Sequence, residues 1–208
     1  MKKPSHLVIA LDDDPAVLTS LENLLAAHGH PVRTHTNPGD LIRAGRPEVP
    51  ACLLLDHQLA DGMTGADVHA DLQRRGWDIP TIFLTAHWSV QSVVNAMRAG
   101  ADGFLTKPYD PGELLEEIAS ALDHARTLMQ TNSKISDLRT RAATLTPRER
   151  SIVLLVTQGL RNREIASQLG LALVTIKVHR GRAMRKLGAG NPAQLAHLAA
   201  MAGLVDRP

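Results

Sequence analysis

The chain has 208 residues, a formal net charge of +2 and 44% hydrophobic residues, which is ordinary for one large globular domain or two small ones. No apolar run approaches the roughly 20 residues that a membrane-spanning helix needs, so we expect no membrane association. The lone cysteine, Cys52, lies inside an apolar run, which excludes a disulfide framework and favours a reducing, cytoplasmic location.

The charges are divided unevenly along the chain. Residues 1–124 carry 17 acidic against 9 basic side chains, whereas residues 125–208 carry 4 acidic against 14 basic ones. A basic half points to a polyanion such as nucleic acid. A merely solvated basic surface would have the same composition, so charge alone leaves both interpretations open.

Short apolar runs alternate with helical patterns in the acidic half. The runs cover residues 7–11, 32–36, 52–56, 81–85 and 103–106, and the helical patterns cover 15–28, 41–44, 66–75, 89–99 and 113 onward. This alternation predicts βαβ units, and therefore a parallel sheet with helices on both faces. The run CLLLD ends in an acid, which indicates a strand buried on both faces with Asp56 at its carboxyl end.

Polar side chains follow four of these predicted strands. They are Asp12, Asp13, Asp56, Thr85 and Lys107. The carboxyl ends of parallel strands meet at one edge of a sheet, so we expect these side chains to lie together. Crowded carboxylates repel one another and favour a hard cation, and Mg²⁺ with its oxygen ligands fits. Each residue alone would be an ordinary turn or cap residue, but the ordered set is more specific.

Residues 5–124 resemble the receiver domain of two-component response regulators, through Asp12-Asp13, Asp56, Thr85-Ala86 and Lys107-Pro108. The resemblance implies a flavodoxin-like (βα)₅ fold in which Asp56 accepts a phosphoryl group from a sensor histidine kinase. It implies that Asp12, Asp13, Asp56 and the backbone carbonyl of Gln58 hold Mg²⁺. It also implies that Lys107 contacts the phosphate, while Thr85, Ala86 and Phe104 form the switch.

The loop after the acceptor departs from the family pattern. Leu59-Ala60 replaces the usual Met-Pro pair, and Gly65 lies nine rather than eight residues after Asp56, which indicates one inserted residue and a local bulge. Gln58 and His87 stand at the positions that often tune the lifetime of the phosphate in this family.

Two other functions are compatible with parts of this pattern. A Mg²⁺-dependent phosphatase could use Asp56 as its nucleophile, but such enzymes commonly place an acid two residues later, where this chain has Gln58. A phosphorylation-independent regulator would not need the complete acid set. We therefore predict a regulator and not an enzyme.

The segment from residue 113 to residue 142 keeps a helical pattern without glycine or proline. Its apolar residues fall mostly at heptad-like spacing, interrupted by Asn132 and Arg139. We expect a helical linker over residues 125–142, following a receiver domain over residues 1–124. The alternatives are pairing of this helix with a second copy, or a final receiver helix with a frayed extension.

The basic half reads as a run of short helices. Thr146, Pro147 and Glu149 predict a capped helix over residues 148–158, and Asn162 is predicted to cap a second one over residues 163–168. Gly170 then makes a tight turn before an amphipathic basic segment, residues 174–187, and a last helix over residues 192–202. Helix, glycine turn and helix is the helix-turn-helix pattern.

Residues 143–205 resemble the LuxR-type DNA-binding domain, from LTPRER through to MRKLGA, and we expect this domain to cover residues 143–208. The resemblance implies an all-α four-helix domain in which residues 174–187 are the recognition helix. The predicted DNA contacts are Thr175, Lys177, Val178, His179, Arg180, Arg182 and Lys186. His179 could equally hold the domain together, and Ala172 lacks the side chain of the usual serine cap.

These observations together predict a transcriptional response regulator of the FixJ/NarL type. Phosphorylation would favour a homodimer, or free the basic domain, and the dimer would bind paired half-sites of promoter DNA roughly 10 base pairs apart. The sequence does not choose between these two routes of activation.

Overall fold

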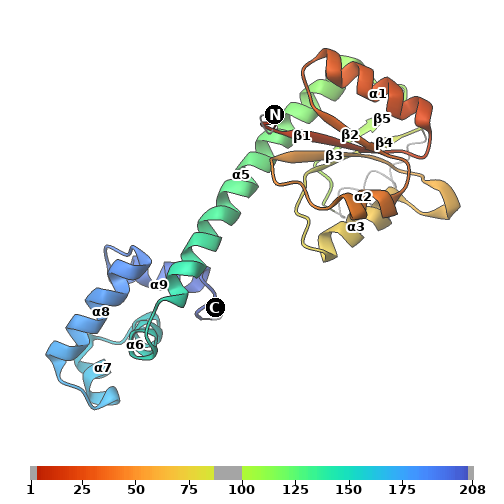
Figure 1. Ribbon diagram of the computed structural model, residues 1–208. Helices are drawn as coiled ribbons and strands as arrows, with labels where there is room; N and C mark the ends of the chain where they lie inside the picture. The colour runs from red at the N-terminus through yellow and green to blue at the C-terminus, as the bar shows by residue number, and fades with distance from the viewer. Residues whose placement is uncertain (1–3, 87–99, 206–208) are drawn as a thin grey trace. The chain divides into compact units, whose positions relative to one another are not determined.

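The computed structural model describes residues 4–86 and 100–205 (Figure 1). The chain forms two compact units, Met1–Met129 and Gln130–Pro208. No helix in the described ranges is long and apolar enough to cross a bilayer.

The first unit is built on a five-stranded parallel sheet. The strands are β1 (Leu7–Leu11), β2 (Val32–His35), β3 (Ala51–Asp56), β4 (Thr81–Thr85) and β5 (Gly103–Thr106), in the spatial order β2-β1-β3-β4-β5. Each predicted strand is confirmed to within one residue at either end. The order reverses between β1 and β3, and in such open sheets ligands bind at the carboxyl ends of the strands where the order reverses.

Helices cover both faces of this sheet (Figure 1). On one face α1 (Pro15–Ala27) and the start of α5 (Pro111–Ala143) enclose a core, and on the other face α2 (Pro38–Ala44) and α3 (Gly65–Arg74) enclose a second. The predicted helix over residues 89–99 lies outside the described residues. The flavodoxin-like fold predicted for this half is confirmed.

Cys52 faces the core between the sheet and α1 and is fully buried. Burial raises the pKa of its thiol to about 12. The side chain is therefore an apolar filler and not a reactive thiol, as its place in the sequence indicates.

Helix α5 is continuous over 33 residues, which confirms the prediction of a long helix through residues 125–142. Leu114 and Ile118, near its start, are fully buried against the sheet. Near its end Leu138 and Ala142 belong to the core of the second unit. The last turns of the helix are thus part of the second unit.

The second unit consists of the end of α5 and a helical bundle. The bundle helices are α6 (Pro147–Thr157), α7 (Asn162–Leu169), α8 (Leu173–Leu187) and α9 (Pro192–Met201). Ile152, Ile176 and Leu195 are fully buried in its core. The predicted capping box is confirmed, because the Thr146 N–H donates to Glu149 Oε2 at 2.9 Å and the Glu149 N–H donates to Thr146 Oγ1 at 3.3 Å.

The predicted cap of α7 is wrong. Asn162 is the first helical residue, and the N-cap is Arg161, whose backbone N–H donates to Glu164 Oε2 at 2.5 Å. The Asn162 side chain instead accepts a hydrogen bond from Arg180 Nη1 at 2.5 Å. Arg180 is 18 residues away in the sequence, so the residues near Asn162 could not reveal that Arg180 takes up its side-chain oxygen.

Candidate phosphoacceptor site and DNA-binding helix

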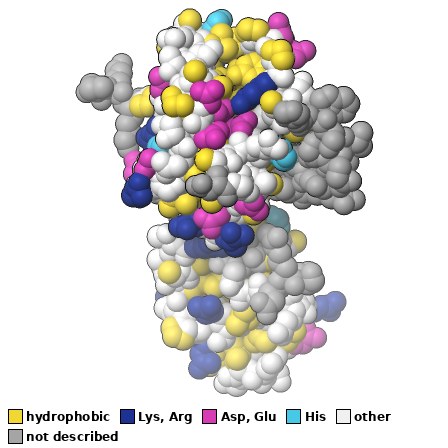
Figure 2. Space-filling model, turned by 90° about the vertical axis from the view of Figure 1, so that its right-hand side faces the viewer, with side chains coloured by type: hydrophobic (Ala, Val, Ile, Leu, Met, Phe, Trp, Pro, Cys, Tyr) yellow, Lys and Arg dark blue, Asp and Glu magenta, His cyan; other side chains and the backbone are white. Residues whose placement is uncertain are grey.

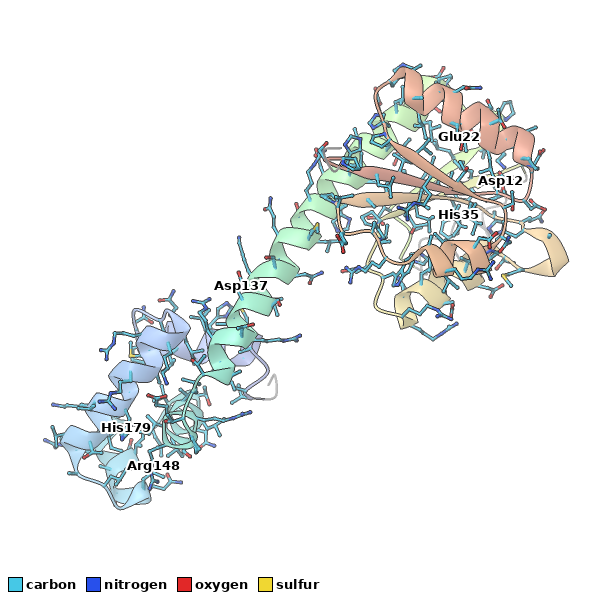
Figure 3. The ribbon with its side chains drawn as sticks, in the orientation of Figure 1. Asp12, Glu22, His35, Asp137, Arg148 and His179 are labelled. Carbon is cyan, nitrogen blue, oxygen red and sulfur yellow. The ribbon has the colours of Figure 1, made fainter. Side chains whose placement is uncertain are left out.

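The carboxyl edge of the sheet brings together side chains from separate strands. Asp12 follows β1, Asp56 ends β3, and Lys107 follows β5 (Figure 3 labels Asp12). Lys107 Nζ donates to Asp12 Oδ2 at 2.6 Å and to Asp56 Oδ1 at 2.7 Å. Asp12 and Asp56 are 3% and 9% exposed, so the lysine forms an ion pair with two buried carboxylates.

These residues line an open cleft of about 500 Å³. Its wall comprises Asp12, Asp13, Asp14, Val17, Asp56, Gln58, Leu59, Thr85, Ala86 and Lys107. Figure 2 looks onto this side of the first unit and shows a group of acidic side chains next to a basic one. Asp13 is exposed at the mouth of the cleft, whereas Thr85 is 2% exposed in its wall.

The charges in the cleft are coupled. Burial raises the pKa of Asp56, although the hydrogen bonds from Lys107 oppose that rise. Burial alone would lower the pKa of Lys107, but its bonds to Asp12 and Asp56 outweigh that effect and raise the pKa. The ammonium group of Lys107 is thus held in its charged form by its two carboxylate partners. A buried carboxylate in such a place is a candidate functional group.

The acidic residues suit a divalent cation. Asp12, Asp13 and Asp56 each offer a carboxylate oxygen, and these oxygens lie within 4.8 Å of one another. Lys107 supplies one positive charge against these three negative ones, so the cleft keeps excess negative charge. Hard oxygen ligands, few in number and beside open space for water, fit Mg²⁺.

The loop after Asp56, in which the family pattern predicts one inserted residue, is compact. Ala60–Gly62 form a single 3₁₀ turn, in which Gly62 has a φ of 74°. The backbone then closes on itself, because the Leu59 N–H donates to Met63 O at 3.0 Å and the Gly65 N–H to His57 O at 2.9 Å. A tight turn thus closes the loop, and α3 begins directly after it, at Gly65 beside the acceptor strand. The predicted inserted residue stays a prediction.

The outer face of α8 carries the exposed basic residues of the recognition segment. Lys177, Arg182 and Arg185 are exposed there, together with Val174 and Val178. The opposite face packs into the core through Ile176, Ala183 and Leu187. A helix that packs one apolar face into its domain and exposes a basic face can lie in the major groove of a DNA duplex, where its cations lie near the phosphates.

Two of the predicted contact residues on α8 have partners inside the unit. Arg180 is bonded to Asn162, as described above. Lys186 Nζ donates to Glu149 Oε2 at 2.7 Å and to the backbone carbonyl of Thr144 at 2.8 Å. Glu149 is 2% exposed, so this pair fixes the end of α8 to the start of α6.

The cleft and α8 lie in two segments of the chain that match two different protein families. Residues 8–119 match the response regulator receiver domain, and residues 143–199 match the LuxR family of bacterial regulatory proteins. The chain is a two-component response regulator. It belongs to the FixJ/NarL kind of transcriptional regulators, which join these two domains.

Full-length relatives agree with this assignment of the response regulator. Nodulation protein W of Bradyrhizobium diazoefficiens is 34% identical over 198 residues, which cover 95% of this chain and 87% of that protein. The transcriptional regulatory protein FixJ of Azorhizobium caulinodans is 32% identical over 201 residues, covering 97% and 93%. Among solved structures, the response regulator StyR has a TM-score of 0.76 at 36% identity, covering 94% of this chain and 98% of that one.

Of the remaining predicted receiver residues of this response regulator, the structure places Gln58 and Ala86 at the cleft but not Phe104. Ala86 lines it, and the Gln58 N–H donates to Asp56 Oδ2 at 3.2 Å. Phe104 is partly buried and packs against the core on the α2 and α3 face. His87 lies outside the described residues. Sequence reasoning missed Asp14, which lines the cleft and whose backbone N–H donates to Asp12 Oδ1 at 3.0 Å.

The predicted DNA-contact residues of this response regulator differ in how exposed their side chains are. Lys177, Val178 and Arg182 are exposed on α8, whereas Thr175 and His179 are half-buried. The His179 Nδ1 atom is buried without a hydrogen-bond partner among the described residues, which favours a packing role for this side chain (Figure 3). The residues that sequence reasoning left out of the contact set are Val174, Arg185, Arg161 and Arg163. The last two line a cleft of about 790 Å³ beside Lys177.

Proposed function

We propose that Asp56 accepts a phosphoryl group from a sensor histidine kinase and that the resulting charge controls DNA binding by α8. The observation that carries the proposal is the position of Asp56, buried at a strand end beside Asp12 and bonded to Lys107 in an open cleft. A carboxylate oxygen attacks the phosphorus, the phosphorus–nitrogen bond of the kinase phosphohistidine breaks, and the histidine leaves with the electron pair.

The charges and positions of the other cleft residues suggest a role for each. Asp12, Asp13, Asp56 and the Gln58 carbonyl would hold Mg²⁺, which when bound offsets the negative charge of the transferring phosphoryl group. Lys107 can move from its two carboxylates to the new phosphate oxygens as a point charge. The exposed Gln58 amide cannot act as an acid, which disfavours the phosphatase alternative and supports a regulator that is not an enzyme.

The output step uses the residues next to the cleft. Phosphorylation adds nearly two negative charges at pH 7, and Thr85, with Ala86, can turn toward them as Phe104 repacks. This change would favour a homodimer that places two α8 helices on promoter DNA. The domain limits at residues 124 and 142 stay predictions, as does the cytoplasmic location indicated by Cys52.

The first link is tested with Asp56→Asn, which we expect to abolish labelling by a phosphorylated kinase or by a small phosphodonor such as acetyl phosphate. Asparagine keeps the shape but removes the nucleophilic charge. The measurement is incorporation of radioactive phosphate, or a mobility shift in a phosphate-binding gel. The matched control is Asp78→Asn, at an exposed aspartate away from the cleft, which should label normally. Continued labelling of Asp56→Asn would identify another acceptor.

The DNA link is tested with Lys177→Ala, which should weaken binding to a selected duplex by about ten-fold. The lost ammonium contacts a phosphate or a base edge, each worth roughly 1–3 kcal/mol where a specific contact is made. Gel shifts at one salt concentration measure the affinity, and a salt titration shows whether the slope falls by about one. Lys134→Ala, an exposed lysine on α5, is the control and should bind as the unchanged chain does. If Lys177→Ala bound the duplex as tightly as the unchanged chain does, α8 would not be the recognition helix.

A further inference from the structure

Two histidines meet at the amino edge of the sheet in the first unit, at the opposite end of the strands from the acidic cleft. His6 directly precedes β1, and His30 lies just before β2. Their rings pack edge to face with centroids 5.1 Å apart, and His6 Nε2 lies 3.0 Å from His30 Nδ1. Both side chains are half-buried, so packing holds the rings in place while solvent still reaches them.

The second ring nitrogen of His6 has a partner of its own. His6 Nδ1 lies 3.1 Å from Ser5 Oγ, a hydroxyl oxygen that can accept the proton of this nitrogen. A proton on Nδ1 leaves Nε2 with a lone pair on the side of His30. Histidines that bind metals commonly hold their other nitrogen in this way, which fixes the tautomer and the orientation of the ring.

Both imidazoles favour the neutral form. Burial lowers the pKa of His6, and the charges of His30 and Arg126 lower it further. Burial, together with His28, lowers the pKa of His30. Neutral imidazole is the form that binds a metal, so both rings are in that form near neutral pH. Arg126 is paired with Asp123, which reduces its repulsion of a cation beside His6.

The separation of the two nitrogens fits a single shared cation. Imidazole nitrogens bind Zn²⁺ at about 2.0–2.1 Å, so two of them at angles of about 90–110° lie roughly 2.9–3.4 Å apart. The observed 3.0 Å is within this range. A hydrogen bond from His30 Nδ1 to His6 Nε2 gives the same separation. A cation replaces that bond without displacing either ring, provided that the His30 proton moves from Nδ1 to Nε2.

We propose that His6 and His30 together bind a divalent cation of the late first-row transition metals, such as Zn²⁺. Imidazole suits Zn²⁺, Cu²⁺ and Ni²⁺, whereas Mg²⁺ prefers the oxygen ligands of the acidic cleft. In the described ranges that cleft is the one place where three potential ligand side chains converge, so water completes the shell of the ion at the histidines. The cation joins the chain entering β1 to the chain entering β2 and stabilises the first unit. The site is independent of the proposed phosphorylation of Asp56.

Calorimetry tests the binding, with the full chain free of any histidine tag. Excess Mg²⁺ is present to keep Zn²⁺ out of the acidic cleft. We expect one Zn²⁺ per chain, bound about ten-fold or more weakly by His6→Gln and by His30→Gln, since loss of even a partner of a ligand costs about that much. His124→Gln is the matched control, because His124 is an exposed histidine of the same unit. It should bind as the unchanged chain does, and equal affinity in all four proteins would overturn the proposal.

Nitrogen NMR of the histidine rings identifies the ligands in the unchanged chain, without reliance on the folding of a variant. Zn²⁺ should shift the signals of His6 Nε2 and His30 Nδ1 together, and the His30 proton should appear on Nε2. If Zn²⁺ left both signals in place, the proposal would be wrong and the contact between the rings would be a hydrogen bond alone.

Urea unfolding followed by tryptophan fluorescence measures the effect on the first unit. Free Zn²⁺ at about one hundred times its Kd should lower the unfolding equilibrium constant about a hundred-fold, which raises the urea midpoint. His6→Gln, compared with and without Zn²⁺, should lose this rise. A rise of the same size in His6→Gln would place the stabilising ion elsewhere and contradict the site.

Discussion

Replacing Gly65 with alanine is expected to destabilise the first unit by about 3 kcal/mol and to displace the acceptor loop. A Cβ atom at this position would lie 2.3 Å from the backbone oxygen of Asp56, 3.0 Å from Leu55 Cγ and 3.1 Å from Phe83 Cε1. Backbone and buried ring atoms cannot move aside as a flexible surface side chain can. Either α3 must shift away from the sheet or Asp56 must move, so we also expect phosphate labelling to fall sharply.

Tryptophan fluorescence during urea unfolding measures this loss, because both tryptophans, Trp77 and Trp88, precede residue 130. The control is Gly181→Ala, another glycine in a helix but without crowding neighbours. It should leave the tryptophan transition unchanged and stabilise α8 by roughly 0.5–1 kcal/mol. A Gly65→Ala chain with the same urea midpoint and the same labelling as the unchanged chain would show that α3 does not pack on the acceptor strand in this way.

Replacing Glu149 with alanine is expected to destabilise the second unit by about 2–3 kcal/mol. The change removes the carboxylate that caps the Thr146 N–H, for which a loss of about 1 kcal/mol is typical. It also leaves the Lys186 ammonium group without its buried carboxylate partner, which destabilises the folded state further. Lys186 is partly exposed, so hydration by water offsets part of this loss. Glu149→Gln should cost less, because its amide oxygen still accepts from Thr146.

The Glu149 contribution should depend on pH in a defined direction. Burial raises the pKa of Glu149, but the hydrogen bonds from Lys186 and Thr146 outweigh it and hold the pKa below its usual value. The stabilisation is therefore fully present above the unfolded pKa of about 4.3 and is lost as the pH falls through the lower folded value. The stability gap between the unchanged chain and Glu149→Gln should shrink in acid.

Circular dichroism during urea unfolding, at neutral pH and in steps below about pH 4.5, measures this gap. Glu164→Gln is the matched control, since Glu164 also caps a helix start but is exposed and has no lysine partner among the described residues. It should cost less stability at neutral pH than Glu149→Gln. A gap for Glu149→Gln that stays constant down to the lowest pH would show that the charge of Glu149 contributes nothing.

Features set by local pattern could be predicted from the sequence. The strands before Asp12, Asp56 and Lys107 could be predicted because apolar runs that end in polar residues repeat along the acidic half of the chain. In a parallel sheet the carboxyl ends of these strands lie at one edge. The capping box of Thr146 and Glu149 follows the same logic, because both partners lie within one turn. These features include most of the acidic cleft.

Features set by distant contacts could not be predicted. The bonds of Lys186 to Glu149 and of Arg180 to Asn162 join residues 37 and 18 positions apart, and nothing in the local pattern marks them. The same limit applies to the exposure of Val174, which depends on which face of α8 the bundle covers. The need for Gly65 likewise comes from the close packing of α3 on Asp56.

The sharing of α5 between two cores limits where the chain can be cut. A fragment beginning at residue 143 would lack Leu138 and Ala142, which are 2% and 5% exposed in the intact chain, and would open a hole in the helical bundle. A fragment beginning near residue 130 keeps both. Any proteolytic or recombinant separation of the DNA-binding part should therefore retain the last turns of the preceding helix, or its product will be aggregation-prone.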